Sequence, residues 1–256
     1  MMPPPVVIVT GASGGIGAAI VKHLVETNNR VVATDIDGPS LASVASYSPE
    51  NIVAVQSDIT DRALGEKLVS NALRAFGGLS ALVNCSGWLR DARIQNMDSD
   101  LFRKLIQVNL VGPGHIIDAV LPIFQEQNYG RIISFASRAW LGNFGSSGYS
   151  AAKGGIVGAT RSLAIANGRY GVTVNSIAPG FITTPMTEAM PRNVVDRVID
   201  AIPVGRAGTT EDVSSLVSFL LDQSSGYITG QTYLCCGGRS ISEPIMRDNH
   251  DDNRVA

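Results

Sequence analysis

The stretch Thr10-Gly11-Ala12-Ser13-Gly14-Gly15-Ile16-Gly17 decides the fold. It follows a short run of β-branched residues, Val6–Thr10, and leads into a segment in which Ile16, Ile20 and Leu24 recur every four residues. A glycine-rich loop between a strand and a helix is typical of dinucleotide-binding proteins, because glycine permits a tight turn and lets the backbone approach a pyrophosphate. The first N–H groups of the helix and the positive end of its dipole then face the anion.

Six further apolar or β-branched runs follow along the chain, and several are apolar at successive positions, as in parallel strands covered on both faces. They are Val31–Thr34, Ile52–Gln56, Ala81–Asn84, Arg131–Ser137, Val172–Ile177 and Thr232–Cys235. Segments with helical periodicity lie between them, and a long helix within Asp98–Gln127 is expected to bend near Pro113. The alternation predicts an α/β fold: a single Rossmann-like, doubly wound parallel sheet of about seven strands with helices on both faces.

We interpret residues 1–256 as one dinucleotide-binding and catalytic domain, because no linker divides the sequence. Residues 181–203 interrupt the strand–helix rhythm with prolines, methionines and a short helical stretch, Arg192–Ala201. We interpret this excursion as a lid over the substrate. The polar tail, residues 239–256, is expected on the surface.

Charge and cysteine content exclude several classes of partner. Lys plus Arg total 20 against 22 for Asp plus Glu, which indicates no nucleic-acid or membrane partner. Cys85, Cys235 and Cys236 form no CxxC pair, so we expect no metal site, and they are interpreted as small packing residues in a reducing compartment. The N-terminal apolar run meets Gly11 long before it could span a bilayer, so a cytoplasmic protein is expected.

Asp35 bears on the choice of cofactor. It ends the second expected strand, 18 residues after Gly17, near the spacing of roughly 20 residues at which an acidic side chain meets the adenosine ribose. A carboxylate there accepts hydrogen bonds from both ribose hydroxyls and repels a 2′-phosphate, which favours NAD over NADP. Asp37 lies close by, so the sequence leaves the identity of the carboxylate open.

Tyr149 and Lys153 lie four residues apart in an expected helix, so both side chains emerge on one face. An ammonium beside a phenol favours the phenolate and lowers the tyrosine pKa from its usual value of about 10. Ser137, twelve residues before Tyr149, is placed to hydrogen-bond the same substrate oxygen. Alone, such a Tyr–Lys pair is more often an ordinary surface pair. Together with the glycine-rich loop it indicates acid–base catalysis.

From Val6 to about Gly238 the sequence resembles the short-chain dehydrogenases/reductases. The glycine-rich loop from Thr10 to Gly17 looks like the cofactor loop of that family. Asp58-Ile59 looks like its adenine-contacting pair, and Asn84-Cys85-Ser86-Gly87 looks like its Asn-Asn-Ala-Gly motif. The stretch Pro179-Gly180-Phe181-Ile182-Thr183-Thr184 resembles the segment that contacts the nicotinamide. Cys85 and Ser86 depart from the family pattern, which weakens the transfer of a role at that turn.

The resemblance implies four catalytic residues, of which Asn109 holds a water in a proton relay; they are Asn109, Ser137, Tyr149 and Lys153. The expected cofactor contacts are Gly11, Ser13, Gly15, Ile16, Gly17, Asp35, Ile36, Asp58, Ile59, Asn84, Ser86, Gly87, Tyr149, Lys153, Pro179, Gly180, Ile182 and Thr184.

Within the family, the chain looks most like the 3-oxoacyl-ACP reductase branch. Biosynthetic members of that branch use NADPH and carry basic residues that dock an acidic carrier protein. Here those positions hold Asn128-Tyr129 and Arg169-Tyr170. We therefore expect an NAD-dependent dehydrogenase that interconverts a secondary alcohol and a ketone, acting on a 3-hydroxyacyl thioester or a bulky, aromatic hydroxy substrate. The alternatives are an NADPH-dependent 3-oxoacyl-ACP reductase and, in another class, a catalytically idle nucleotide-binding subunit.

The expected substrate pocket is apolar and partly aromatic, and its walls are assigned to Trp88, Arg90, Trp140, Phe144, Met186 and Met190. Trp140 and Phe144 fit packing roles equally well. Arg90 and Arg93 either meet an anionic group, such as the phosphate of a CoA thioester, or are solvated loop residues. The resemblance also implies a homotetramer, assembled through the helices around 98–127 and 147–170 and through the last strand.

Overall fold

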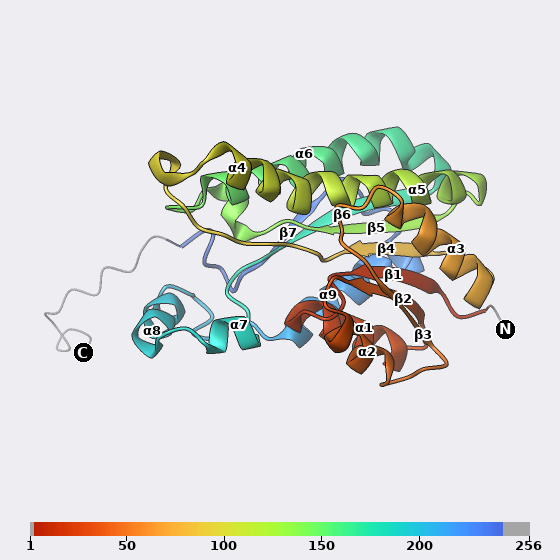
Figure 1. Cartoon of the computed structure of the whole chain (residues 1–256), viewed down its shortest axis with the longest axis horizontal. Helices are drawn as coiled ribbons and strands as arrows, with labels where there is room; N and C mark the ends of the chain where they lie inside the picture. Colours follow the sequence, from red (N-terminus) through yellow and green to blue (C-terminus); the bar gives the residue numbers. More distant parts are fainter. Residues whose placement is uncertain (1–2, 243–256) are drawn as a thin grey trace, which may run out of the picture.

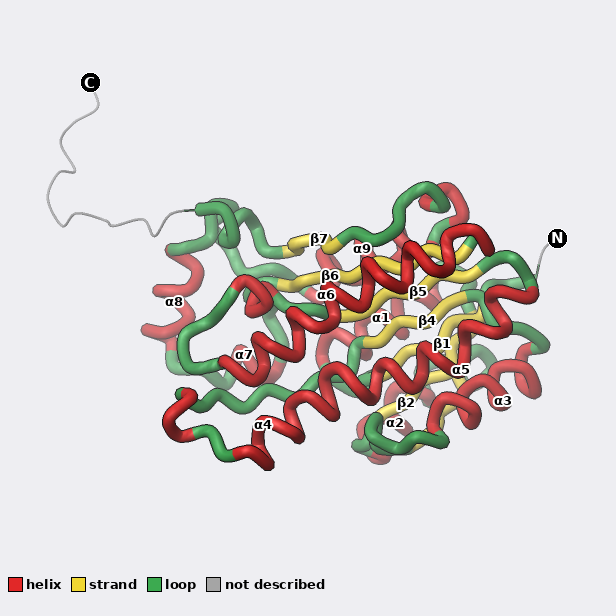
Figure 2. The backbone as a smooth tube through the Cα atoms, turned by 90° about the horizontal axis from the view of Figure 1, so that it is seen from above, coloured by secondary structure: helices red, strands yellow, loops and turns green. Residues whose placement is uncertain are grey.

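The computed structural model describes residues 3–242, and these build one seven-stranded sheet in which every strand pair is parallel (Figure 2). The strands lie in the order β3-β2-β1-β4-β5-β6-β7. They are β1 (Val6–Thr10), β2 (Arg30–Asp35), β3 (Ile52–Gln56), β4 (Ala81–Asn84), β5 (Gly130–Phe135), β6 (Val172–Pro179) and β7 (Thr232–Cys235). The predicted doubly wound α/β fold is confirmed.

Helices cover both faces of this sheet, and β1 shows why. Val7 and Val9 pack in one apolar cluster with helices α1, α2 and α9, whereas Val6 and Ile8 pack in a second cluster with α3, α5 and α6 (Figure 1). Both sets are buried, because successive side chains of a strand point to opposite faces. The helices are α1 (Gly15–Glu26), α2 (Gly38–Ala45), α3 (Leu64–Phe76), α4 (Ser99–Ile106), α5 (Gly112–Glu126), α6 (Ser147–Asn167), α7 (Pro185–Glu188), α8 (Arg192–Asp200) and α9 (Thr210–Leu221).

The expected long helix within 98–127 is present, and it changes form in the middle. A π-helical turn, Gln107–Val111, joins α4 to α5 just before Pro113. Pro113 has no N–H to donate to the carbonyl of residue 109, four positions earlier, so a regular helix cannot continue there. Of residues 3–242, only Ser99–Glu126 is long and apolar enough by composition to cross a membrane. In the fold, Ile116, Val120 and Phe124 of this stretch pack on the sheet.

The carboxyl ends of the strands meet at one edge, and the chain reverses direction across the sheet between β1 and β4. In a doubly wound sheet this switch point is where a ligand crevice forms. β5 ends at Phe135, two residues earlier than expected, because Ser137 begins a 3₁₀ turn, Arg138–Leu141, and accepts a hydrogen bond from the N–H of Ala139. The expected lid, residues 181–203, holds α7 and α8, which lie to one side of the sheet (Figure 1).

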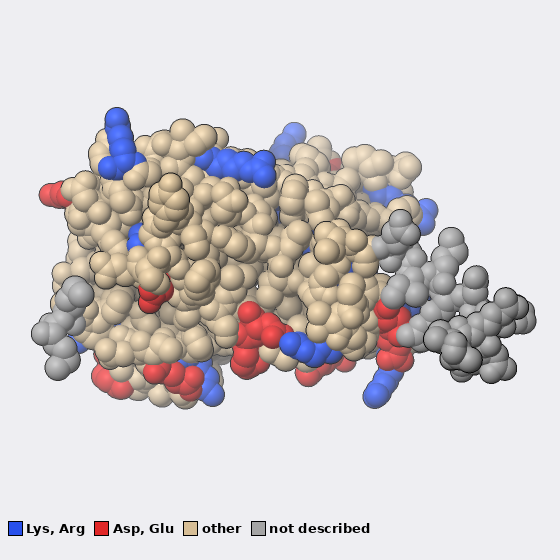
Figure 3. Space-filling view, turned by 180° about the vertical axis from the view of Figure 1, so that it is seen from behind, with Lys and Arg blue, Asp and Glu red and all other residues tan. Residues whose placement is uncertain are grey.

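Of the polar tail, residues 239–242 are described and residues 243–256 lie outside the described part of the chain. On the face shown in Figure 3, Lys and Arg side chains are scattered toward the margins and the middle carries little charge. On this face of the described residues, the Lys and Arg side chains form no basic stripe of the kind that binds a nucleic-acid backbone.

Candidate active site

A cavity of about 960 Å³ lies at the carboxyl edge of the sheet, on the β1–β4 switch point. Its volume is at the upper end of the range of about 300–1,000 Å³ found for small-molecule and cofactor sites. All but one of the expected cofactor contacts line it. They are Gly11, Ser13, Gly15, Ile16, Gly17, Asp35, Ile36, Asp58, Ile59, Ser86, Gly87, Tyr149, Lys153, Pro179, Gly180, Ile182 and Thr184.

The glycine-rich loop packs so closely on its own backbone that side chains would not fit. A Cβ at Gly17 would lie 1.9 Å from the carbonyl oxygen of Gly11, and Gly11 itself has a positive φ of 64°. At the start of α1, Gly14 provides no side-chain cap, so the first N–H groups of the helix face the cavity without a side-chain acceptor. A helix start of this kind suits a pyrophosphate.

The structure separates the two carboxylates that the sequence left open. Asp37 caps α2: its side chain accepts hydrogen bonds from the N–H of Ser40 at 3.2 Å and from the Ser40 hydroxyl at 2.7 Å. Asp35 lines the cavity at the end of β2, and its Oδ2 accepts from the N–H of Ser13 at 3.0 Å. Asp35 is therefore the carboxylate that faces the cavity, and the backbone of the phosphate loop holds it in place.

Tyr149 and Lys153 occupy the first two turns of α6, and Ser137 lies beside them at the end of β5. The Ser137 hydroxyl lies close enough to the Tyr149 hydroxyl to act on the tyrosine pKa. Lys153 is buried, and its Nζ donates to the carbonyl of Phe135 at 2.7 Å while lying 5.6 Å from the centre of the Tyr149 ring. The structure thus brings the three residues together at the cavity wall, as the sequence predicts.

The protonation of these groups differs from the expectation. Burial raises the pKa of Tyr149, and the hydrogen bond from Ser137 opposes that shift without overcoming it. Burial also lowers the pKa of Lys153 to about 8, and Lys153 is not among the groups that shift the pKa of Tyr149. The expected lowering of the tyrosine pKa by Lys153 is therefore wrong for the chain by itself. Burial raises the pKa of the Cys85 thiol to about 12, consistent with a packing role.

Asn109 and Asn84 are buried just behind the cavity and are not part of its lining. The Asn109 amide donates to the carbonyl of Trp88 at 2.8 Å, and its oxygen accepts from the Trp88 N–H at 3.1 Å. This side chain therefore joins the π-helical turn to the loop after β4, and its expected role in holding a water stays a prediction. The Asn84 amide donates to the carbonyl of Pro113 at 3.3 Å, so Asn84 joins β4 to α5.

The expected substrate residues divide into two groups. Trp88 and Met186 line the cavity, whereas Arg90, Trp140, Phe144 and Met190 do not. Phe144 is 84% exposed, and the Arg93 guanidinium stacks 5.0 Å from its ring centre. Trp140 packs in a small cluster against α6, the packing role that the sequence had left open.

Several lining residues were not predicted. Thr34 is the second-last residue of β2 and Ser57 directly follows β3, so their position at the carboxyl edge of the strands was the available signal. Asn143 and Ser146 also line the cavity, and Asp91 reaches them from the loop after β4 by a hydrogen bond from the Ser146 hydroxyl. No short motif marks this last contact, because its partners are 55 residues apart.

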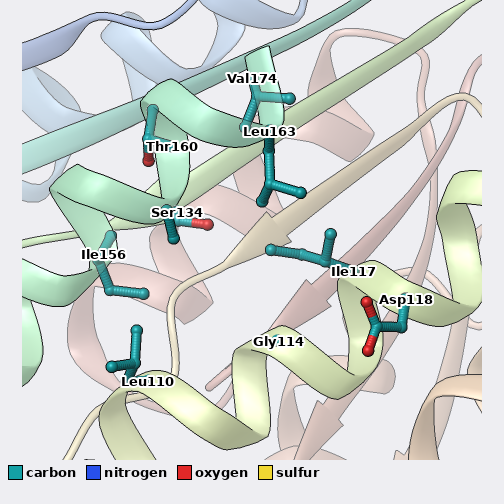
Figure 4. Close-up of a pocket in the computed structure, with 10 residues that line it drawn as sticks. Leu110, Gly114, Ile117, Asp118, Ser134, Ile156, Thr160, Leu163 and Val174 are labelled. Atoms are coloured by element: carbon teal, nitrogen blue, oxygen red, sulfur yellow. The ribbon is translucent and has the colours of Figure 1, made fainter. Parts of the chain in front are cut away.

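A second, smaller cavity of about 130 Å³ lies between α5 and α6 (Figure 4). Aliphatic side chains of both helices, including Ile117, Ile156 and Leu163, point into it, with the Asp118 carboxylate at its side. It contains none of the expected catalytic residues. Among residues 3–242, no group of three or more His, Cys, Asp or Glu side chains is arranged to hold a metal ion.

Comparison with known proteins agrees with this geometry. Residues 11–240 match a family model described as enoyl-(acyl carrier protein) reductase. The subunit BbsD of (2S)-[(R)-hydroxy(phenyl)methyl]succinyl-CoA dehydrogenase from Thauera aromatica is 37% identical over 92% of this chain and 96% of its own. The 3-oxoacyl-[acyl-carrier-protein] reductase FabG of Salmonella typhimurium is 35% identical over 91% of this chain and 96% of its own.

Two further relatives extend the comparison. The (3R)-3-hydroxyacyl-CoA dehydrogenase of Canis lupus familiaris is 34% identical over 90% of this chain and 94% of its own. The crystal structure of levodione reductase superimposes with a TM-score of 0.87 at 30% identity and covers 93% of this chain and 98% of its own. Matches of this extent, on a chain whose Ser, Tyr and Lys meet beside a glycine-rich loop, show that the protein belongs to the short-chain dehydrogenase/reductase family, in its FabG-like branch.

Proposed function

We propose that this protein is an NAD-dependent dehydrogenase that interconverts a secondary alcohol and a ketone, with 3-hydroxyacyl thioesters as its substrate class. Membership of the family makes the chain an oxidoreductase that acts on CH–OH groups and binds a nicotinamide cofactor. The observation that supports the proposal most directly is the contact of the Ser137 and Tyr149 hydroxyls beside Lys153, in the same cavity as Asp35. Two relatives are named as dehydrogenases of hydroxyacyl-CoA compounds.

The residues of the cavity divide the chemistry among them. A bound nicotinamide supplies the hydride acceptor. Tyr149 takes the hydroxyl proton of the alcohol at its phenolic oxygen, while the Ser137 hydroxyl holds both that oxygen and the substrate oxygen in place. Lys153, held by the carbonyl of Phe135, binds the ribose beside the nicotinamide.

The preference for NAD is proposed from the surroundings of Asp35. The cations that line the cavity among the described residues are Lys104 and Lys153, and Lys104 lies over the Trp88 ring at 4.9 Å, on the loop after β4. A 2′-phosphate placed at the end of β2 would therefore meet the Asp35 carboxylate and no arginine or lysine of that lining. Repulsion of the phosphate and loss of the ribose hydrogen bonds both favour NAD.

Steady-state kinetics with each cofactor test this proposal. We expect kcat/KM with NAD to exceed that with NADP by roughly 10- to 100-fold, the value of one or two hydrogen bonds to a charged group. Asp35→Ser should remove most of the preference, and the matched control Asp37→Ser should keep it, because Asp37 caps α2. Equal or better turnover of the unmodified protein with NADP would instead favour the runner-up, a 3-oxoacyl-ACP reductase, which the FabG relatives support.

The alternative of an idle nucleotide-binding subunit makes a different prediction. In that case, no member of a panel of 3-hydroxyacyl thioesters and aromatic secondary alcohols would reduce NAD, although NADH would bind. The retention of Ser137, Tyr149 and Lys153 in contact argues for the enzyme.

We also propose a cytoplasmic homotetramer. Exposed apolar side chains support the assembly: Ile165 on α6 is 85% exposed, and Leu234 on the edge strand β7 is 38% exposed. Nothing lies within 4 Å of a Cβ at Gly154 or Gly158, so α6 offers a smooth face to another helix. Light scattering should give a molar mass of about four times the 26.9 kDa of one chain. A monomer at micromolar concentration would contradict the proposal.

A further inference from the structure

We propose that Asp91 is a positioning residue for the catalytic tyrosine. Through the Ser146 hydroxyl, its carboxylate holds the loop after β4 against the start of α6 and keeps a negative charge beside the substrate side of the cavity. The inference rests on the proposed function for the acid–base role of Tyr149. It adds a group that acts on Tyr149 without lining the cavity.

The contact between Asp91 and Ser146 joins two segments that are 55 residues apart in the sequence. The Ser146 hydroxyl donates to Asp91 Oδ1, and the next residue, Ala92, forms a parallel β-bridge with Ser146. Asp91 lies in the loop after β4, whereas Ser146 directly precedes α6, three residues before Tyr149. A side-chain contact and a backbone contact therefore hold this loop at the end of α6 that carries the catalytic tyrosine.

The Ser146 hydroxyl is committed to Asp91 instead of to its helix. Ser146 occupies the N-cap position of α6, where a serine usually accepts a hydrogen bond from one of the first helical N–H groups, but its hydroxyl caps none of them. It accepts from the Asn143 amide at 3.1 Å and donates to Asp91, so three side chains form a chain of hydrogen bonds that ends on the carboxylate. Ser146 is buried, and both Ser146 and Asn143 line the cavity.

Asp91 also brings a charge that α6 lacks. The first turn of α6 contains no acidic residue, and a negative charge near a helix N-terminus interacts favourably with the helix dipole. No ion pair among residues 3–242 includes Asp91. Arg93, two residues further on, instead stacks its guanidinium on the Phe144 ring. No cation of the described residues therefore pairs with the carboxylate beside the start of α6.

This charge acts on the catalytic tyrosine. Burial raises the pKa of Tyr149, the Ser137 hydroxyl lowers it, and Cys85 and the Asp91 carboxylate raise it further. Burial raises the pKa of the Cys85 thiol to about 12, so this thiol is neutral at ordinary pH and Asp91 supplies the negative charge. A raised pKa makes the phenolate a stronger base and moves the pH at which it forms upward.

Other charged groups lie on the elements that pack around the start of α6. They are Arg90 and Arg93 in the loop after β4, Asp98, Asp100, Arg103 and Lys104 at α4, Arg138 in the 3₁₀ turn and Lys153 on α6 itself. None of them is among the groups that shift the pKa of Tyr149. The effect of Asp91 can therefore be tested by changing its charge alone.

The pH dependence of turnover tests this role. We would measure kcat/KM for the oxidation of 3-hydroxyhexanoyl-CoA by NAD between about pH 6 and pH 10, where a phenol with a perturbed pKa can act as a base. Asp91→Asn removes the charge and keeps an oxygen that can accept the Ser146 hydroxyl. The limb of the profile that rises with pH should therefore move to lower pH, while the plateau stays within about threefold.

The control is Asp100→Asn, which makes the same charge change on α4, where the Asp100 side chain is 89% exposed. It should leave the profile unchanged. A rising limb at the same pH in Asp91→Asn as in this control would overturn the proposal, because a merely structural contact would not move it.

A double-mutant cycle tests whether Asp91 acts through Ser146. Asp91→Ala and Ser146→Ala each remove the hydrogen bond, and each should lower the plateau of kcat/KM by roughly tenfold, the value of a hydrogen bond to a charged group. The double variant should lose little more than either single variant, because both remove the same contact. Losses that multiply would show that the two side chains act independently and that the positioning role is wrong. Asp91→Asn decides the question if an alanine variant does not fold.

A titration without substrate separates this inference from the proposed function. The chain contains six tyrosines, so ¹³C labelling of their Cζ atoms, with Tyr149→Phe as the reference, identifies the Tyr149 signal by NMR. With saturating NAD, this signal should titrate at lower pH in Asp91→Asn than in the unmodified protein and in Asp100→Asn. If no thioester is turned over but this shift is seen, the proposed function fails and the role of Asp91 stands. If thioesters are turned over and Tyr149 titrates at the same pH in all three proteins, the inference fails and the function stands.

Discussion

The cofactor side and the substrate side of the cavity are built differently. On the cofactor side, every expected contact except Asn84 lines the cavity, and many of these contacts are glycines or residues at the ends of strands. On the substrate side, only Trp88 and Met186 of six expected residues line it, and Met186 is 74% exposed. A wall made of backbone is determined by local sequence. A wall made of side chains from separate loops depends on how those loops pack.

The largest effect on activity is expected at Tyr149, where the cofactor side and the substrate side of the cavity meet. Tyr149→Phe removes the group that takes the proton and leaves the ring in place, so kcat should fall by about 10²- to 10⁴-fold. NADH binding, followed by fluorescence, should stay within about twofold, because Lys153 and the glycine-rich loop are untouched. Tyr227→Phe, at a fully exposed tyrosine, is the matched control and should retain full activity. Retention of more than a tenth of kcat in Tyr149→Phe would contradict the catalytic assignment.

The backbone character of the cofactor side predicts the next effect. A Cβ at Gly17 would lie 1.9 Å from the backbone oxygen of Gly11, which no side-chain rotation can relieve. Gly17→Ala should therefore lower the free energy of unfolding by about 1–3 kcal/mol or more, as overpacking does, and weaken NADH binding. Gly78→Ala, with nothing within 4 Å, should stay within about 0.5 kcal/mol. Equal denaturation midpoints for the two variants would show that the loop adapts.

Lys153 predicts a pH dependence of stability. Its pKa is lowered to about 8 in the folded protein, from 10.5, so the unfolded chain binds more protons between those values. Stability associated with this group therefore rises as the pH increases from 8 to 10.5 and is lowest below pH 8. Lys153→Met should gain roughly 2 kcal/mol at pH 7, after the lost hydrogen bond to Phe135 is subtracted.

The gain in the free energy of unfolding from Lys153→Met should disappear by about pH 10.5. Thermal unfolding of both proteins at pH 7 and pH 10 measures it, with kcat lost in the variant at either pH. A constant difference in midpoint across this pH range would mean that burial does not shift the pKa of Lys153.

The smallest effects should be found on the substrate side. Phe144→Ala should change the free energy of unfolding by less than about 0.5 kcal/mol, because the ring is mostly exposed, and should leave kcat/KM nearly unchanged. Met186→Ala, at a residue of the cavity lining, should lower kcat/KM by roughly threefold for a substrate with an apolar chain. A larger fall in kcat/KM in Phe144→Ala than in Met186→Ala would show that Phe144 contacts the bound substrate.

The strands could be predicted because they are short apolar or β-branched runs, and in β1, β4, β5 and β6 both faces are buried. A bend near Pro113 could be predicted, but not the π-helical form of the turn before it, whose Asn109 side chain contacts Trp88 of the loop after β4. The tyrosine pKa was predicted with the wrong sign. Helical spacing shows that Lys153 is near Tyr149, but only the folded structure shows that both are buried and that the lysine bonds the Phe135 carbonyl.

The sequence by itself determined the doubly wound sheet, the glycine-rich loop and the identity of the Ser, Tyr and Lys that meet beside it, because these depend on residue type and on spacing within a few turns of chain. The tertiary structure decided which carboxylate faces the cavity, which of the expected aromatic residues line it, and that Asp91 meets Ser146. The physical reason is distance along the chain. Asp91 and Ser146 become neighbours only in the folded chain, and burial there raises the pKa of Tyr149 and lowers that of Lys153.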